Sequence, residues 1–281
     1  MVSKVAEAEV VGEAITALFV PGDRPQRFSK AAAARPDVVI VDWEDAVAPQ
    51  SKAAATASTM EFLSDGFVAL VRTNPIGSPT FESELEALAE LATTPGNGLL
   101  GIMLPKADSA QDVERICRRL PANLAVVPLI ESAAGLVAAM KLAAIPGVTR
   151  LAFGAIDFAL DIGADDGDQY LAYARSELVV VSRAANIAAP LDSPTPEFDD
   201  VEFVASAARY ARGFGFSGKL CIHPRQVSIV AAAFLPDDVT VAWARKVAGA
   251  ADGVSTVDGT MVDRPVIERA RRVLRRIGEA V

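Results

Sequence analysis

The stretch AVVPLIESAAG, residues 125–135, is apolar for six residues and then carries a carboxylate, Glu131, where the run ends. A second stretch, RLAFGAIDFAL at residues 150–160, ends its apolar run on Asp157. Continuous apolar character is typical of a strand covered on both faces, as in a parallel sheet. Because a carboxylate at the end of a buried strand costs free energy unless it pairs or binds something, the two acids indicate a functional site.

Apolar runs of the same kind recur along the chain at fairly even spacing. We interpret as strands the runs TALFVPG (16–22), VVIVDWED (38–45), FVALVRTN (67–74), LGIMLPK (100–106), AVVPLIE (125–131), RLAFGAID (150–157), AAPLDS (188–193) and GKLCIH (218–223). Amphipathic segments between them predict helices at 25–34, 80–91, 109–120, 132–145, 170–186 and 200–215. Ser78, Ser109 and Asp200 are expected to cap three of these helices.

Strand and helix alternating eight times predicts an α/β fold, a (β/α)8 TIM barrel, over residues 1–250. A doubly wound open sheet is the alternative, but no GxGxxG fingerprint follows the first apolar run. The remaining residues, 251–281, contain a Gly- and Asp-containing turn and a basic final helix. We expect this segment to be a C-terminal helical lid extension.

Composition narrows the class of protein. The 281 residues include 27 Lys and Arg against 36 Asp and Glu, and this net charge of -9 argues against a nucleic-acid partner. The two cysteines lie in no ligand or disulfide pattern. The N-terminus lacks the apolar core of a signal peptide, and no run of about 18 residues is free of charge. We therefore expect a cytoplasmic protein that does not cross a membrane.

Active sites of such barrels lie at the carboxyl ends of the strands. Every predicted strand ends in ionisable groups, and together these would form a charged barrel mouth. From the first strand to the eighth, the groups are Asp23 and Arg24, Glu44 and Asp45, Arg72 with Asn74, Lys106, Glu131, Asp157, Asp192 and His223.

Glu131 and Asp157 follow neighbouring strands, so their carboxylates are expected to approach closely. Two such groups share a proton or hold a cation, and all-oxygen ligation favours Mg²⁺, with Mn²⁺ as a second choice. The alternative is a pair bridged by Arg or Lys. Arg72 suits a carboxylate or a developing oxyanion, whereas Lys106 fits a structural ion pair equally well. For His223 we favour hydrogen bonds that close the mouth over a role as general base.

These residues together resemble the citrate lyase beta-subunit-like family, which includes malyl- and citramalyl-coenzyme A lyases, within the HpcH/HpaI aldolase superfamily. The matching motifs, in order, are LFVPGDRPQRF, VIVDWEDAVAPQSKAAA, VRTNPIGSP, GIMLPKADSAQDV, LIESAAGL, LAFGAIDFALDIGA, GKLCIHPRQV and DGTMVDRPVIERARRVL. One departure is Trp43, where the family has a smaller aliphatic residue in DLED, and Trp43 is expected to reshape the packing below the mouth.

The resemblance implies a homotrimer or hexamer in which the C-terminal segment of one subunit covers a neighbour's site. It implies that Glu131 and Asp157 hold Mg²⁺ and that Glu44 supports the metal's water shell. Arg72 would contact the thioester or acid oxygen. The acid/base would be Asp263, with Asp258 as a less favoured alternative. The remaining substrate contacts would come from Lys106, Asp45, Gly154 and Ala155.

The function implied is a carbon–carbon lyase. It would cleave, or form by condensation, a 3-hydroxyacyl-coenzyme A thioester such as a malyl, citramalyl or citryl thioester. The products would be an acetyl thioester and a 2-oxo acid. Three alternatives stay open: a metal-dependent aldolase for free 2-oxo acids, a citrate lyase beta subunit inside an acyl-carrier complex, and a non-catalytic thioester-binding subunit.

Overall fold

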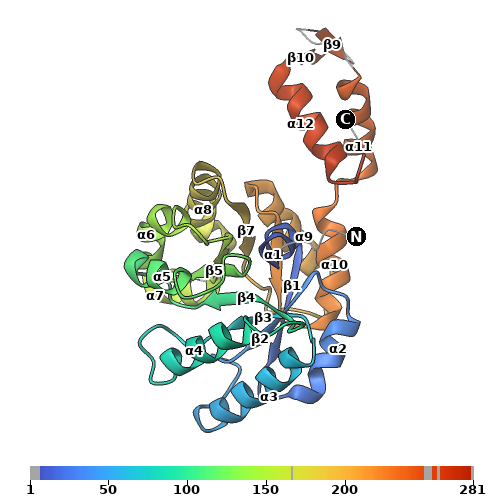
Figure 1. The fold of residues 1–281 in the computed structure, drawn as a ribbon. Helices are drawn as coiled ribbons and strands as arrows, with labels where there is room; N and C mark the ends of the chain where they lie inside the picture. Colours follow the sequence, from blue (N-terminus) through green and yellow to red (C-terminus); the bar gives the residue numbers. More distant parts are fainter. Residues whose placement is uncertain (1–6, 166, 250–254, 258–259, 280–281) are drawn as a thin grey trace. The chain divides into compact units, whose positions relative to one another are not determined.

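The computed structural model describes residues 7–165, 167–249, 255–257 and 260–279 (Figure 1). The chain divides into two compact units, Met1–Val230 and Ala231–Val281. The division falls inside the helix Pro224–Phe234, whereas the sequence placed the end of the barrel at residue 250.

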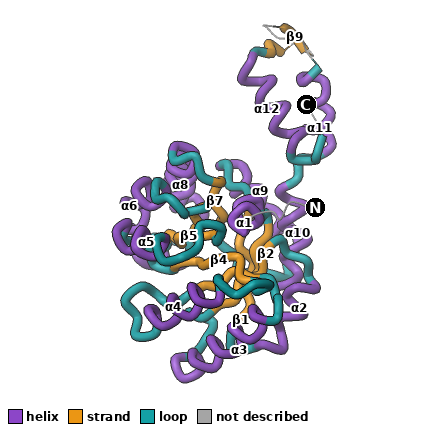
Figure 2. The backbone as a smooth tube through the Cα atoms, viewed as in Figure 1, coloured by secondary structure: helices purple, strands orange, loops and turns teal. Residues whose placement is uncertain are grey.

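The first unit contains a closed barrel of eight parallel strands in chain order, and β1 pairs with β8 to close it. Figure 2 shows the strands at the centre of this unit with helices around them. The strands are β1 (Thr16–Pro21), β2 (Val38–Asp42), β3 (Ala69–Arg72), β4 (Leu99–Leu104), β5 (Ala125–Ile130), β6 (Arg150–Phe153), β7 (Ala188–Asp192) and β8 (Gly218–Cys221). The TIM barrel predicted from the apolar runs is therefore confirmed.

Helices alternate with these strands. They are α1 (Glu7–Glu13), α2 (Phe28–Ala33), α3 (Lys52–Ser64), α4 (Phe81–Leu91), α5 (Ala110–Cys117), α6 (Ala133–Ala143), α7 (Ala155–Ile162), α8 (Ala172–Ala184), α9 (Val201–Phe214) and α10 (Pro224–Phe234), with short 3-10 turns at Pro25–Arg27, Pro49–Ser51 and Asp168–Leu171. The sequence did not separate α7 from the strand before it.

Two of the three expected helix caps are confirmed. The Ser109 side chain accepts a hydrogen bond from the Asp112 amide, and Asp200 caps α9 in the same way. The expectation for Ser78 is wrong, because α4 begins at Phe81 and Thr80 precedes it. Ser78 instead lies in successive turns, in which its amide donates to the Pro75 carbonyl and its carbonyl accepts from Phe81.

The interior of the barrel is filled by apolar side chains, and α1 closes its amino-terminal end. Val11 of α1 and Ala14, which follows α1, belong to the same buried cluster as Ile40, Val127 and the other inward-facing strand residues. The side chain of Arg150, fully buried at the start of β6, donates to the carbonyls of Val11 and Ala14 at 2.9 and 2.8 Å. With this end plugged, the interior of the barrel can be reached at the carboxyl ends of the strands.

The second unit has its own small core. Its elements are α11 (Asp238–Ala248), the antiparallel strands β9 (Ser255–Val257) and β10 (Thr260–Val262), and α12 (Arg264–Arg275). Val241, Val262, Ile267 and Leu274 are among the residues buried against one another. This finding confirms a helical C-terminal region.

One segment of the described residues, Pro224–Ala248, is long and apolar enough to cross a membrane by length and composition alone. This is weak evidence, because core helices of soluble proteins pass the same test. The segment is two helices, α10 and α11, separated by the non-helical residues 235–237 with Pro236 among them.

Candidate active site

Arg72 and Asp42 form a buried, bidentate ion pair at the barrel mouth. The two residues end β3 and β2 and are register partners. Arg72 Nε and Nη2 donate to the two oxygens of Asp42, each at 2.7 Å, and Asp42 is 1% exposed. Asp42 also accepts from the amides of Glu44 and Ala46. This arrangement fixes the guanidinium, and its Nη1 atom is the nitrogen that does not contact Asp42.

Glu44 lies beside this Nη1 atom, which also donates to Asp45 Oδ2 at 3.3 Å. Its Oε1 accepts from Lys106 Nζ at 3.0 Å, and its Oε2 lies 2.8 Å from Arg72 Nη1. No group among the described residues donates a hydrogen bond to this buried Oε2. Burial raises the pKa of Glu44 and the Asp45 charge adds to this, against the opposing effect of Arg72 and Lys106. The orphaned oxygen is suited to a donor that arrives with a ligand, such as metal-bound water.

Glu131 follows β5 directly, as the apolar run predicts, and is 4% exposed. Its Oε1 accepts from the Lys106 amide at 2.7 Å, and Lys106 holds a left-handed backbone with φ of 50°. Burial, together with the charges of Glu44 and Asp157, raises the pKa of Glu131 to about 7. A bound cation would relieve this repulsion.

Asp157 reaches the same place by a different route from the one we expected. β6 ends at Phe153, and Asp157 lies in the first turn of α7. Gly154 makes this possible, since a Cβ there would lie 2.7 Å from Glu131 Cβ and 2.9 Å from Glu131 Oε2. The prediction that Asp157 ends a strand is therefore wrong. Its place near Glu131 follows from the close packing of Gly154 against Glu131.

Ala155 begins α7, and its amide donates to Ser193 Oγ at 3.0 Å. Ser193 follows β7 and is 2% exposed. Gly154 has no side chain to cap the helix, so Ser193 caps α7 from the neighbouring loop. This contact stabilises the turn that carries Asp157.

A cavity of about 490 Å³ opens between these groups. Of the predicted site residues, Asp45, Arg72, Glu131, Gly154 and Asp157 line it. The other lining residues are Phe19, Pro21, Asp42, Ala46, Leu129, Ile156, Ser193, Pro194, Leu220 and Ile222.

Four predicted residues are absent from this lining. Glu44 and Lys106 adjoin the cavity through their contacts with Arg72 and Glu131, while Ala155 lines a neighbouring cavity. Asp263 belongs to the C-terminal unit, where its side chain caps α12 by accepting from the Val266 amide. The alternative Asp258 lies outside the described residues.

Two other strand-end groups differ from the expectation that all of them gather at the mouth. Asp192 is 1% exposed and pairs with Lys219 Nζ at 2.7 Å and Arg175 Nε at 2.9 Å, so it stabilises the barrel wall. His223 stacks on Phe198 with the ring centres 4.5 Å apart. Its Nδ1 accepts from the Arg225 amide two residues along the chain, and the expectation that His223 closes the mouth by hydrogen bonds stays a prediction.

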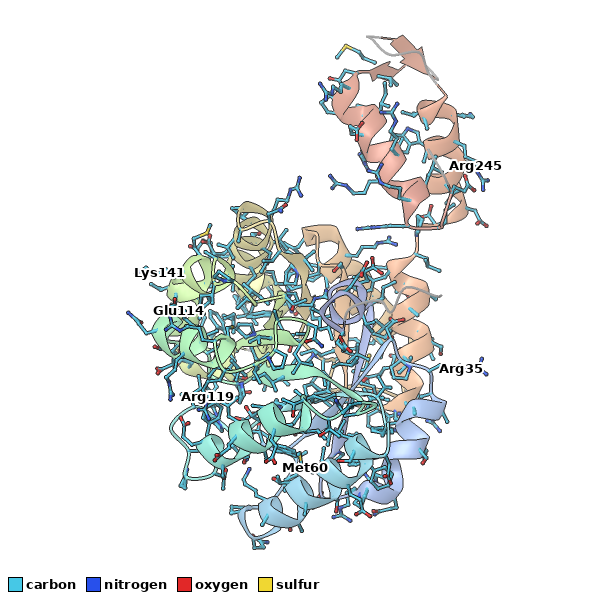
Figure 3. The ribbon with its side chains drawn as sticks, in the orientation of Figure 1. Arg35, Met60, Glu114, Arg119, Lys141 and Arg245 are labelled. Carbon is cyan, nitrogen blue, oxygen red and sulfur yellow. The ribbon has the colours of Figure 1, made fainter. Side chains whose placement is uncertain are left out.

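The outer surface carries the ordinary charges of a solvated barrel. Figure 3 shows Glu114, Arg119 and Lys141 pointing away from the strands, outside the ring of the barrel. Within the described residues no group of three or more His, Cys, Asp or Glu side chains could hold a metal ion. A pair of carboxylates is what remains, and Mg²⁺ commonly binds through one or two of them with water and substrate at its other positions.

Sequence reasoning missed Asp42, although a signal was present. The strand VVIVD (38–42) ends on this aspartate, and the neighbouring strand ALVR (69–72) ends on Arg72. It also missed Ser193, whose role depends on a contact between loops that no local pattern contains.

A closed (β/α)8 barrel with one end plugged and paired carboxylates beside a fixed arginine at the other defines a TIM-barrel enzyme. Residues 16–224 match the model of the HpcH/HpaI aldolase/citrate lyase family, and the chain belongs to this family.

Curated relatives agree with this assignment. The chain is 38% identical over 273 residues to the citrate lyase subunit beta-like protein of Mycobacterium tuberculosis (strain CDC 1551 / Oshkosh), over 94% of this chain and 95% of that protein. It is 32% identical to the L-malyl-CoA/beta-methylmalyl-CoA lyase of Cereibacter sphaeroides (strain ATCC 17029 / ATH 2.4.9), over 92% of each. The expectation of a lyase is thus confirmed, because the relatives are lyases of this family.

Solved structures give the same result. CitE of M. tuberculosis in complex with magnesium, acetoacetate and coenzyme A matches with a TM-score of 0.83 and 35% identity, over 95% of this chain and 100% of that one. The citrate lyase beta subunit of M. tuberculosis complexed with oxaloacetate and magnesium matches with a TM-score of 0.70 and 34% identity, over 80% and 99%.

Proposed function

We propose that this protein is a Mg²⁺-dependent lyase that cleaves a 3-hydroxyacyl-coenzyme A thioester into an acetyl thioester and a 2-oxo acid. The observation that carries the proposal is that Glu131, packed closely against Gly154 at the start of α7, and Asp157 in the first turn of α7 line one cavity with the fixed guanidinium of Arg72. A malyl, citramalyl or citryl thioester fits the proposal. The relatives described with magnesium, oxaloacetate and coenzyme A support it.

The residues present fit a magnesium ion. Glu131 and Asp157 would hold it, and the orphaned Oε2 of Glu44 would accept a hydrogen bond from its water shell. Burial and the charges of Glu44 and Asp157 raise the pKa of Glu131, and a bound cation would offset both effects. When bound, Mg²⁺ supplies a Lewis acid and a template for the oxo-acid half of the substrate.

The chain's own groups would then position and stabilise the substrate. The positive end of the α7 dipole favours the substrate carboxylate, while the Ala155 amide itself is held by Ser193 Oγ. Arg72 Nη1 would stabilise the negative charge that develops on the thioester oxygen when the carbon–carbon bond breaks. Asp45 and Lys106 would complete the substrate contacts, as the family resemblance implies.

Asp263 would deliver a proton to the acetyl carbon during cleavage and remove it during condensation. The support is its place at the start of α12 in the C-terminal unit, together with the family resemblance of its motif. Residues 251–281 would act as a lid over a neighbouring subunit's barrel in a cytoplasmic homotrimer or hexamer. Lid closure would restrict proton transfer to the loaded site.

Condensation tests the proposal directly. The protein is incubated with Mg²⁺, acetyl-coenzyme A and, separately, glyoxylate, pyruvate and oxaloacetate, and products are identified by mass. A condensed thioester with one oxo acid supports the lyase. Aldol products from free 2-oxo acids without the thioester would favour the aldolase, and thioester binding without turnover would favour a non-catalytic subunit.

A further inference from the structure

A second polar network lies behind the site, in the loop that carries Glu44. Lys52 is the first residue of α3, and its ammonium donates to the carbonyls of Trp43 at 2.8 Å and Glu44 at 3.1 Å. It also donates to Asn74 Oδ1 at 2.5 Å. One cation therefore ties the loop after β2 to the loop after β3.

The network continues into the protein through Asn74. The side-chain Nδ2 of Asn74 donates to Glu84 Oε1 at 2.5 Å. The backbone N–H of Asn74 donates to Glu84 Oε2 at 3.0 Å. Asn74 and Glu84 are each 2% exposed. The side-chain amide of Asn74 thus joins the buried Glu84 carboxylate on one side to the Lys52 ammonium on the other. Each hydrogen bond in such a chain polarises the next.

Helix formation alone does not account for Lys52. A cation at the first position of a helix faces the positive end of the helix dipole, which disfavours it. The three acceptors that surround the ammonium compensate for this position. Two of these acceptors are the backbone of the residues that bring the Glu44 side chain to the mouth.

We propose that Lys52, Asn74 and Glu84 are positioning residues that hold the Glu44 carboxylate at the metal site. The inference rests on the proposed function, because Glu44 has its role only if Mg²⁺ binds between Glu131 and Asp157. The network touches neither the metal nor the substrate. It acts through the backbone of Trp43 and Glu44.

The test measures Mg²⁺ affinity by calorimetry in a double-mutant cycle. Lys52→Met, which keeps the aliphatic stem, should weaken Mg²⁺ binding by roughly tenfold. In a Glu44→Gln background the same change should weaken it by less than about twofold, because the residue through which Lys52 acts is already altered. Equal effects in both backgrounds would overturn the inference. The matched control is Lys141→Met on α6, whose effect should be negligible.

A second readout does not depend on the metal. In a Trp243→Phe background the fluorescence of Trp43 reports on the loop alone, since the chain has two tryptophans. Lys52→Met and Asn74→Ser should each increase quenching of Trp43 by acrylamide, and Lys52→Arg should restore protection at least in part. Quenching unchanged in both disruptive variants would contradict the inference.

The two readouts separate this inference from the proposed function. If the wild-type protein binds no Mg²⁺ but both disruptive variants expose Trp43, the lyase proposal fails and the loop restraint stands. If Mg²⁺ binding and condensation occur normally in Lys52→Met and Asn74→Ser, the lyase proposal stands and the positioning role fails.

Discussion

The carboxylate of Asp42 accepts two hydrogen bonds of 2.7 Å from the guanidinium of Arg72, at the ends of two adjacent strands. Desolvation by burial would lower the pKa of Arg72, but its hydrogen bonds to Asp42 and the charge of Asp42 outweigh this and raise it. A permanent cation in a fixed orientation results, and one nitrogen remains directed at Glu44 and Asp45. Such a group can meet a developing oxyanion without reorganising.

Asp42→Asn should therefore impair both stability and catalysis. The variant leaves a buried guanidinium without its principal counter-charge, and we expect the free energy of unfolding to fall by about 3 kcal/mol. We also expect kcat to fall, because Arg72 loses its fixed orientation. Urea denaturation and the condensation assay check the two effects. Asp65→Asn, at an exposed position after α3, is the control, and an equal response of both variants would refute the assignment.

Gly154→Ala tests the close approach that brings the metal site together. The added Cβ would lie 2.7 Å from Glu131 Cβ, so either Glu131 or α7 must shift. We expect kcat/KM to fall about 100-fold, as for a displacement of catalytic groups by about 1 Å. Gly213→Ala on α9 has open space around its Cβ and should be neutral or slightly stabilising. Unchanged turnover in Gly154→Ala would mean that the two acids need not approach.

The pKa of Glu131 gives a pH dependence with a definite sign. Its folded value of about 7 lies above the ordinary 4.5, so between these pH values the folded protein binds more protons than the unfolded chain. The metal-free protein should lose stability as pH rises from about 4.5 to about 7 on account of this group. Mg²⁺ affinity should rise over the same range, because binding requires the carboxylate.

Melting temperatures of the metal-free protein across this pH range check the first effect. Glu131→Gln should flatten the decline, whereas Glu90→Gln, at an exposed position, should leave it as in the wild type. A decline of the same size in Glu131→Gln would show that another group is responsible.

Arg150→Met tests the plug at the opposite end of the barrel. It removes the donor to the carbonyls of Val11, Ala14 and Ala189 and to Ser217 Oγ. We expect a loss of about 3 kcal/mol or more in the free energy of unfolding, with Mg²⁺ affinity unchanged. Arg119→Met breaks an exposed ion pair with Glu82 and should change the stability far less than Arg150→Met does. Weakened Mg²⁺ binding in a still-folded Arg150→Met protein would contradict the separation of plug and site.

The barrel was predictable because parallel strands covered on both faces are continuous apolar runs, and all eight runs contain the observed strands or most of their residues. Glu131 was placed correctly for the same reason. Asp157 was placed on the wrong element because FGAIDF stays apolar across the change from strand to helix, and only the contact of Gly154 with Glu131 marks the boundary.

Pairing partners were beyond the reach of sequence patterns. Asp192 has the same strand-end signal as Glu131, yet it is neutralised by Lys219 from the next strand and Arg175 from α8. The two acids differ in their neighbours, which only the folded chain brings together. The role of Asp263 stays a prediction for a related reason, because it lies in the C-terminal unit.

The central claim is that Glu131 and Asp157 hold the magnesium ion that the reaction needs. Its most direct test is calorimetric titration of the full-length protein with Mg²⁺, for the wild type, Glu131→Gln and Asp157→Asn. Asp161→Asn, one turn further along α7, serves as the control. We predict one bound Mg²⁺ per chain in the wild type and the control, and no measurable binding in the two site variants. Wild-type affinity in either Glu131→Gln or Asp157→Asn would contradict the account.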